Sequence, residues 1–367
     1  MNWQGLRLGL VGPLPPPSGG MANQTRQLAE LLAAEGVHVT LVQSNAAYRP
    51  AWAAKLTGIR ALFRLLPYAL SLWRCAGEAQ LFHVMANSGW SWHLFAAPAV
   101  WIARMRGVPV IVNYRGGEAA AFLERSAHWV RWSLHAASVL AVPSGFLRDV
   151  FGRFRIDAEV LPNIVDTSRF RFMARGRHDA PHLVVTRNLE AIYDIPTALR
   201  AFATVHKSFP LARLSVAGDG PELQRLTATV DALGITAAVR FTGPLDREQI
   251  ATLYREADIL VNPSRVDNMP NSVLEALACG LPVVSTRVGG VPYLVRDGVS
   301  ALLVDAGDAE AMAEAVLRIL RDAGLAERLV TTGVAEAQQY TWARVRLRLA
   351  ELYERVLPVG QPRVTTA

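Results

Sequence analysis

Lysine, cysteine and long apolar runs are scarce in this sequence of 367 residues. Lys55 and Lys207 are the only lysines, so arginine supplies nearly all of the positive charge. The two cysteines, Cys75 and Cys279, are far apart and have neither metal-binding nor redox spacing, which argues against a disulfide framework. The longest apolar run, residues 94–103, contains a proline and is far shorter than the roughly 20 residues that span a bilayer. These absences favour a soluble α/β protein that is at most peripheral to a membrane.

Metal-binding and nucleic-acid-binding patterns are also missing from the sequence. There is no Asp-x-Asp motif, and the histidines are not spaced as metal ligands, so we expect no metal site and no cofactor. No module of basic and aromatic residues suited to nucleic acid is recognisable, so we expect no such partner. The apolar stretch at residues 6–12 runs into a proline cluster and is better interpreted as a buried first strand than as a secretory signal.

Positive charge is concentrated in the first half of the chain. Residues 1–170 contain 16 arginine or lysine and 9 aspartate or glutamate residues, whereas residues 171–367 contain 22 of each kind. The formal net charge of +7 therefore belongs to the first half. The scarcity of lysine fits genomic base composition, but the asymmetry is harder to explain that way. A cationic half attracts acidic surfaces such as anionic lipid.

Short apolar runs alternate with segments of helical spacing, such as 22–34 and 90–106, along the chain. This alternation indicates parallel strands buried on both faces, and hence a doubly wound α/β sheet. The pattern occurs twice, which fits the two domains expected for this length. The predicted strands are residues 6–11, 37–42, 81–85, 108–113 and 139–142 in the first half, and 182–186, 213–217, 239–242, 259–261, 282–285 and 301–304 in the second.

The strand signals stop and restart around a polar, basic stretch near residue 170. We therefore predict an N-terminal domain over residues 1–168 and a C-terminal domain over residues 169–340. An amphipathic segment predicts a last helix, and we expect residues 341–367 to return to the N-terminal domain. Ligands bind such sheets outside the carboxyl ends of the strands, so the loops that follow strands are the places to search for chemistry.

The strongest functional signal lies after the strand predicted at residues 259–261. Pro270 suits the start of a helix, Asn271 or Ser272 can cap it, and Gly280 is suited to ending it. A helix that starts at the carboxyl end of a strand presents free amides, such as those of Ser272 and Val273, together with the positive end of its dipole. This arrangement is suited to a phosphate group.

Two acids accompany this helix start. Glu275, in the first turn, can accept hydrogen bonds from ribose hydroxyls, and Asp267, eight residues earlier, can reach a sugar. Together with the apolar segment after Glu275, this acid-x7-Glu pattern resembles the signature of the retaining glycosyltransferases of family 4. The resemblance implies the GT-B fold, in which two Rossmann-like domains face each other across a cleft. It also implies that Glu275 binds the donor ribose and that Asp267, where the family usually has glutamate, contacts the donor sugar. Without the resemblance, the two acids would only complement the helix dipole.

Other segments match the same family in the same order. The glycine-rich loop that contains Gly19 and Gly20 resembles the loop that faces the donor diphosphate. Arg187, directly after a predicted strand, matches the arginine that binds this diphosphate. Gly218 and Asp219 match a turn that lines the nucleobase pocket.

Two positions depart from the family pattern. A lysine is common five or six residues after the position of Arg187, where this chain has Ile192 and Tyr193. A histidine is common where this chain has Arg115. We expect an active branch of the family, in which Arg115 brings a fixed cation to the donor phosphates.

The resemblance implies a cytoplasmic, metal-independent hexosyltransferase. It would move a sugar, with retention, from a nucleotide-sugar such as a UDP-sugar or GDP-sugar to a glycan or lipid-linked acceptor, in cell-surface polysaccharide or glycolipid synthesis. Its catalytic residues would be Arg187, Asp267, Glu275 and Arg115. Two alternatives stay open, namely a sugar-nucleotide epimerase of the same fold and a relative that binds sugar-nucleotides without catalysis.

Residues 48–73 combine apolar side chains at three- and four-residue spacing with basic ones. Such a segment suits a helix that lies on an anionic membrane, here the inner face of the plasma membrane. An amphipathic helix packed on its own sheet would show the same pattern, and the sequence leaves both interpretations open.

Overall fold

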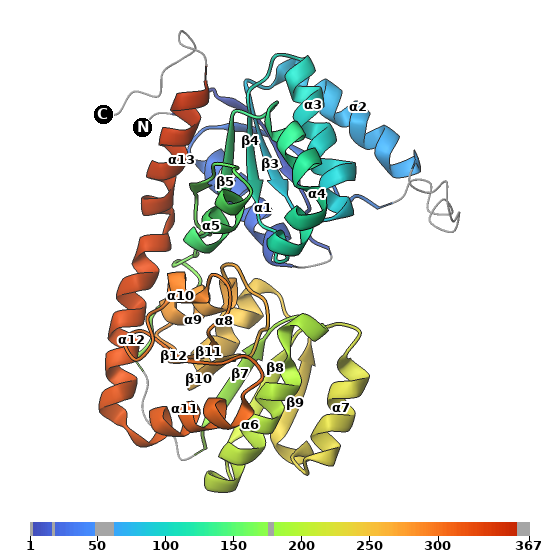
Figure 1. Cartoon of the computed structure of the whole chain (residues 1–367). Helices are drawn as coiled ribbons and strands as arrows, with labels where there is room; N and C mark the ends of the chain where they lie inside the picture. The colour runs from blue at the N-terminus through green and yellow to red at the C-terminus, as the bar shows by residue number, and fades with distance from the viewer. Residues whose placement is uncertain (1–2, 17–18, 48–61, 175–179, 358–367) are drawn as a thin grey trace. The chain divides into compact units, whose positions relative to one another are not determined.

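The computed structural model describes residues 3–16, 19–47, 62–174 and 180–357, and it separates the chain into two compact units (Figure 1). The first unit runs to Asn163 and resumes at Val345, and the second is Ile164–Arg344. The predicted boundary after residue 168 falls slightly later than this division. Residues 164–168 belong to the second unit, because Val165 pairs with Thr341 of that unit.

A parallel sheet of six strands, in the order β2-β1-β3-β4-β5-β6, forms the centre of the first unit. Its strands are β1 (Arg7–Gly12), β2 (His38–Gln43), β3 (Leu81–Ala86), β4 (Val110–Tyr114), β5 (Val139–Val142) and β6 (Glu159–Val160). Its helices are α1 (Gly20–Ala34), α2 (Leu62–Glu78), α3 (Ala97–Met105), α4 (Ala119–Leu134), α5 (Gly145–Arg153) and most of α13 (Trp342–Val356). The strand order reverses direction at β1, as in a doubly wound sheet.

The second unit repeats this architecture with the strand order β12-β11-β10-β7-β8-β9, all parallel. Its strands are β7 (His182–Thr186), β8 (Arg213–Ala217), β9 (Val239–Gly243), β10 (Ile259–Asn262), β11 (Val283–Thr286) and β12 (Leu302–Val304). Its helices are α6 (Ile195–Ser208), α7 (Leu223–Ala232), α8 (Arg247–Glu256), α9 (Asn271–Ala278), α10 (Val291–Leu294), α11 (Ala309–Arg321) and α12 (Ala323–Ala337). The predicted fold of two Rossmann-like units is confirmed.

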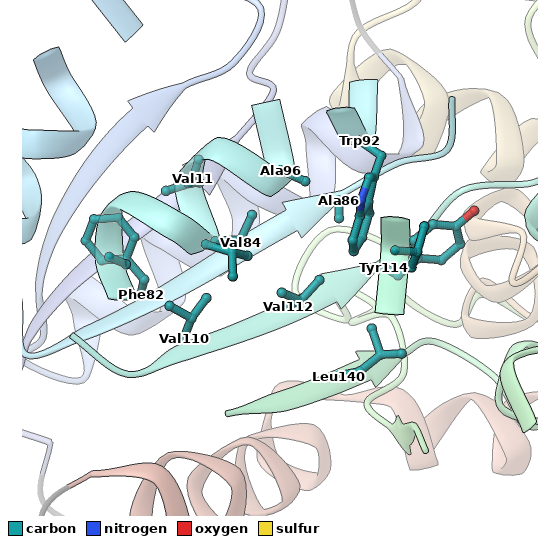
Figure 2. Packing of buried hydrophobic residues seen from close by; sticks show 14 of the residues in the cluster. Val11, Phe82, Val84, Ala86, Trp92, Ala96, Val110, Val112, Tyr114 and Leu140 are labelled. Atoms are coloured by element: carbon teal, nitrogen blue, oxygen red, sulfur yellow. The ribbon is translucent and has the colours of Figure 1, made fainter. Parts of the chain in front are cut away.

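Both faces of each sheet are covered, which is why the strand sequences are apolar throughout. In β3, Phe82, Val84 and Ala86 point into a core shared with α2, α3, α4 and α5 (Figure 2). In β7, Leu183 and Val185 enter one core, whereas Val184 enters the core on the other side. Among the described residues, no helix is both long and apolar enough to cross a bilayer.

The segment predicted as one helix over residues 90–106 is helical without a break over residues 90–105, but its hydrogen-bond pattern changes along it. Trp92–Ala96 forms a π-helical turn, and α3 begins only at Ala97. Pro98 accounts for the π-helical turn, because proline lacks the amide that a regular α-helix needs at this position. The two-residue strand β6 was not predicted either, since it is too short to carry a periodic signal.

The last helix packs on the first unit. His83, fully buried on the second face of β3, accepts a hydrogen bond at Nε2 from the amide of Asn113 (3.0 Å), and its Nδ1 donates to the hydroxyl of Tyr353 (2.9 Å). Burial and the nearby charge of Arg115 lower the pKa of His83 to about 3, so the imidazole is neutral. At the exposed edge of α13, Arg346 forms an ion pair with a carboxylate oxygen of Glu35 (2.9 Å).

We predict that Tyr353→Phe destabilises the protein by about 1–3 kcal/mol, because it leaves the buried Nδ1–H of His83 without an acceptor. Denaturant titration measures this change in the free energy of unfolding. Leu347→Ala, at an exposed position on the same helix, is the control and should change little. Equal stability of Tyr353→Phe and the parent chain would mean that this bond does not hold the helix.

Candidate functional site

The candidate residues of the second unit lie at the carboxyl edge of its sheet, on loops and in the first residues of α9. Strands β10, β7 and β8 are neighbours, so the loops that follow them lie side by side. Arg187 follows β7 directly, Gly218 follows β8, and Asp267 lies on the loop between β10 and α9. The sheet order therefore gathers residues that are up to 80 positions apart in the sequence.

Arg187 is held by three partners. Its Nε donates to Oδ1 of Asn262 (2.9 Å), its Nη2 forms an ion pair with Oδ2 of Asp267, and its guanidinium lies over the ring of Tyr193 (5.2 Å to the ring centre). The side chains of Arg187 and Asp267 are only 12% and 10% exposed. Nη1 of Arg187 makes no hydrogen bond with a residue that the structure describes. The structure thus brings two predicted site residues into direct contact.

A buried polar network supports this ion pair. The hydroxyl of Ser264 donates to Oδ1 of Asn262 (2.9 Å), and the amide of Asn262 donates to the hydroxyl of Ser285 (2.9 Å). Burial raises the pKa of Asp267, and the opposing effects of Arg187, Ser264 and the backbone amide of Asn268 do not fully cancel it. Asn262, which orients Arg187, is thus itself held in place by Ser264 and Ser285.

Helix α9 starts without a side-chain cap. Pro270 occupies the cap position and Asn271 is the first helical residue, so the prediction that Asn271 or Ser272 caps the helix is wrong. The proline directs the chain into the helix one residue earlier than a polar cap at Asn271 would. The hydroxyl oxygen of Ser272 is consequently buried, and it has no hydrogen-bond partner within the described chain. The amides of Ser272 and Val273 have no acceptor inside the helix, which leaves a site suited to an anion.

Glu275 is the fifth residue of α9 and thus lies just beyond the first turn in which it was predicted. Its carboxylate is half-buried and makes no hydrogen bond with any residue in the described part of the chain. Burial raises its pKa to about 7, although the charges of Arg247 and Arg187 lower it. Burial therefore favours the protonated form of Glu275 at higher pH than in an exposed glutamate.

Three charged residues near Glu275 were not predicted as site residues. Asp166 accepts a hydrogen bond from Nη1 of Arg169 (2.8 Å), and Nη2 of Arg247 lies 3.8 Å from the same carboxylate. Burial alone would raise the pKa of Asp166, but the hydroxyl of Ser168 and these two arginines outweigh burial and lower it. The position of Arg247 at the start of α8, after a strand end, was the one available signal.

Glycines position the loop that carries Arg187. Gly218 has a positive φ of 149°, and a Cβ atom there would lie 2.0 Å from the carbonyl oxygen of Arg187. The carbonyl of Asp219 accepts a hydrogen bond from the amide of Leu189 (2.9 Å). A Cβ atom at Gly220 would lie 2.4 Å from the carbonyl oxygen of Leu189. In this structure, Gly218 and Asp219 therefore support the backbone of the Arg187 loop.

Tyr193 stands where a lysine was expected. It ends a short 3-10 turn (Ala191–Tyr193) and places its ring against the guanidinium of Arg187. Burial raises the pKa of Tyr193, so its hydroxyl stays protonated at neutral pH. The expected second cation is replaced by an aromatic side chain that orients the first.

The candidates of the first unit follow β1 and β4. Gly19 is the cap residue of α1 in extended conformation (φ −169°), with no side-chain cap, and Gly20 begins the helix. Arg115 follows β4, its amide donates to the carbonyl of Ala86 (2.8 Å), and its Nη1 donates to Oδ1 of Asn163. Burial lowers the pKa of Arg115 to about 10, which leaves it cationic at neutral pH. Nowhere in the described ranges do three His, Cys, Asp or Glu side chains gather as a metal site.

Known structures share this fold over nearly the whole chain. A sucrose-phosphate synthase of Thermosynechococcus elongatus superposes with a TM-score of 0.75 and 21% identity, over 95% of this chain and 98% of that one. The HepE protein of Anabaena, solved in complex with UDP, gives a TM-score of 0.73 and 17% identity, over 95% and 100% of the two chains. These matches identify the fold as GT-B.

Family models match both units. The model described as Glycosyltransferase Family 4 matches residues 18–169, and the one described as Glycosyl transferases group 1 matches residues 180–322. This chain therefore belongs to the family 4 (group 1) glycosyltransferases. A D-inositol 3-phosphate glycosyltransferase of Corynebacterium jeikeium is 36% identical over 169 residues, which are 44% of this chain and 40% of that protein. The chain spans between 40% and 66% of the length of the first curated relatives that it matches.

We predict that Gly218→Ala destabilises the second unit by at least about 2 kcal/mol and weakens nucleotide binding, because the added Cβ displaces the backbone of Arg187. Thermal unfolding with and without nucleotide measures both effects. Gly152→Ala is the matched control, since a Cβ atom there meets no neighbour within 4 Å. If both variants behave alike, Gly218 does not support the Arg187 loop.

We also predict a pH-dependent effect of Glu275→Gln on stability. Because the pKa of Glu275 rises from 4.5 to about 7 on folding, the native state holds a proton that the unfolded chain releases. The free energy of unfolding therefore falls as the pH rises through this window. Glutamine cannot lose a proton, so the variant should gain stability relative to the parent chain from about pH 5 to about pH 8. Denaturant titrations without nucleotide test this, and parallel curves for the two proteins would contradict the raised pKa.

Proposed function

We propose that this chain is a hexosyltransferase that moves a sugar, with retention, from a nucleotide-sugar to a glycan or lipid-linked acceptor in cell-surface polysaccharide or glycolipid synthesis. One observation carries the proposal. An oriented arginine, an uncapped helix start with a buried unpaired hydroxyl, and a carboxylate without a hydrogen bond occur together at one sheet edge. These groups match the needs of a diphosphate and a ribose.

Each group receives a role in donor binding. The amides of Ser272 and Val273, with the hydroxyl of Ser272, donate to the diphosphate, and Asn271 starts the helix that presents them. Glu275 accepts hydrogen bonds from the ribose hydroxyls. Asp267 keeps one oxygen on Arg187 and offers the other to the donor sugar. The family membership and the UDP complex of the HepE protein support a UDP-sugar as the first donor to test.

The chemistry requires stabilisation of the leaving diphosphate. As the bond between the anomeric carbon and the phosphate oxygen breaks, negative charge collects on the diphosphate, and the acceptor oxygen forms the new bond to the anomeric carbon. The acceptor proton passes to the leaving phosphate. Nη1 of Arg187 and the amides of α9 stabilise this charge. In this proposal the reaction uses no metal ion and no cofactor other than the nucleotide-sugar.

We place the protein in the cytoplasm, at the inner face of the plasma membrane. The membrane contact predicted over residues 48–73 is described only from residue 62, within α2, and the remainder lies outside the described residues. The inner side of α2 packs on its own sheet through Tyr68, Leu72 and Cys75, as the alternative interpretation proposed. Its outer side remains available for a lipid surface.

We predict that one of UDP, GDP and ADP raises the unfolding temperature of the protein, and we expect it to be UDP. The shift should disappear in Glu275→Ala, because the ribose loses its acceptor. Glu222→Ala, which replaces another acid of the same unit, is the matched control and should keep the shift.

Two results would argue against the donor site. One is an equal shift in Glu275→Ala and in the parent chain, and the other is no shift with any nucleotide. A UDP-sugar that is converted without an acceptor would favour the epimerase alternative. A protein that binds UDP but neither transfers nor hydrolyses the sugar would be a non-catalytic relative.

A further inference from the structure

Three neighbouring helices of the first unit carry large apolar side chains on their outer side. Helices α2, α3 and α4 lie side by side and cover one face of the sheet (Figure 1). Their exposed apolar side chains are 46–66% accessible to solvent, namely Leu66, Leu70 and Trp73 in α2, Met105 in α3, and Trp129 and Trp132 in α4. Patches of this kind on a soluble surface usually mark an interaction site.

Ring–ring and cation–π contacts join these side chains into one band. The rings of Trp101 and Trp132 lie 4.3 Å apart, and those of Trp132 and Trp129 lie 6.3 Å apart. Met105 lies one turn after Trp101 on the same side of α3. The guanidinium of Arg106, at the end of α3, lies 4.8 Å from the ring centre of Trp73 in α2. We call Trp73, Trp101, Met105, Trp129 and Trp132 the tryptophan band.

The core does not require this band. The inner sides of the same helices are already filled by residues such as Leu72, Val100 and Leu123, all of which are fully buried. The exposed indoles of Trp73, Trp129 and Trp132 therefore add little to the packing of the unit, and leaving them in water has a free-energy cost. A partner that covers them would remove this cost.

Positive charge borders the band. Arg74 follows Trp73, Arg104 and Arg106 flank Met105, and Arg125 lies one turn before Trp129. The acids on these three helices are Glu78 and Glu124. Cations around a centre of indole and aliphatic side chains complement the anionic headgroups and the upper acyl region of a bilayer. Indole suits this boundary because it combines a large apolar ring with one N–H donor.

We propose that the tryptophan band docks the first unit on an anionic lipid bilayer, with α2, α3 and α4 facing the headgroups. The proposal rests on the membrane location proposed above and extends it to two helices outside residues 48–73. Contact through the helical face leaves the carboxyl edge of the sheet, with Gly19 and Arg115, uncovered. An acceptor held in the bilayer would then lie beside that edge.

The test is co-sedimentation of the full chain with vesicles of phosphatidylcholine and phosphatidylglycerol in equal parts, and with vesicles of phosphatidylcholine alone. We expect binding to the anionic vesicles that weakens at high salt. Trp129→Ser combined with Trp132→Ser should reduce this binding about tenfold, because it removes apolar area that enters the interface. Leu347→Ser, at an exposed position of α13 outside these three helices, is the matched control and should bind as the parent chain does.

Two further measurements keep the interpretation unambiguous. The double variant should retain the unfolding temperature and the nucleotide shift of the parent chain, which separates lost docking from lost folding. A parent chain that binds anionic vesicles but shows no nucleotide shift would count against the donor site alone and leave the docking proposal standing.

Three outcomes would overturn the docking proposal. They are unchanged binding of the double variant, no binding of the parent chain to anionic vesicles, and a dimer in solution that the double substitution dissociates. The last of these would assign the band to a second copy of the chain.

Discussion

The ion pair between Arg187 and Asp267 is the interaction on which the candidate donor site depends. Both side chains are nearly buried, and buried charges are tolerated only when opposite charges and hydrogen bonds replace the lost water. Asn262 and the ring of Tyr193 complete the surroundings of the guanidinium, and Gly218 lets the adjacent loop approach its backbone. The conformations of three loops are thus tied to one pair of charges.

Positive and negative side chains are equal in number around the candidate site of the second unit. Three arginines face three acids, namely Arg169, Arg187 and Arg247 with Asp166, Asp267 and Glu275. When all six are ionised they carry no net charge, and whenever Glu275 holds a proton the group is cationic. The charge of the proposed diphosphate site therefore depends on the protonation of Glu275. Because Glu275 is also the proposed ribose ligand, the proposed site would couple the binding of the ribose to that of the diphosphate.

Much of the fold could be predicted because buried parallel strands are apolar throughout, and β5, β7 and β8 begin and end at the predicted residues. Sequence motifs identified Arg187 and Asp267 as site residues, but they did not predict that the two side chains form an ion pair. That contact depends on the order of the strands in the sheet. The effect of Arg247 on Glu275 depends on packing between distant segments, which leaves no local pattern. The uncapped start of α9 was missed because its cap position is held by a proline with no side-chain donor or acceptor.

The last helix has a consequence for synthesis of the chain. The hydroxyl of Tyr353 that covers His83 is made 270 residues after its partner. At ordinary translation rates of about 5–20 residues per second, Tyr353 is added roughly ten seconds to a minute after His83. During this time the side of β3 that carries His83 is not covered by α13. The first unit therefore cannot complete its packing on the ribosome before the second has been made.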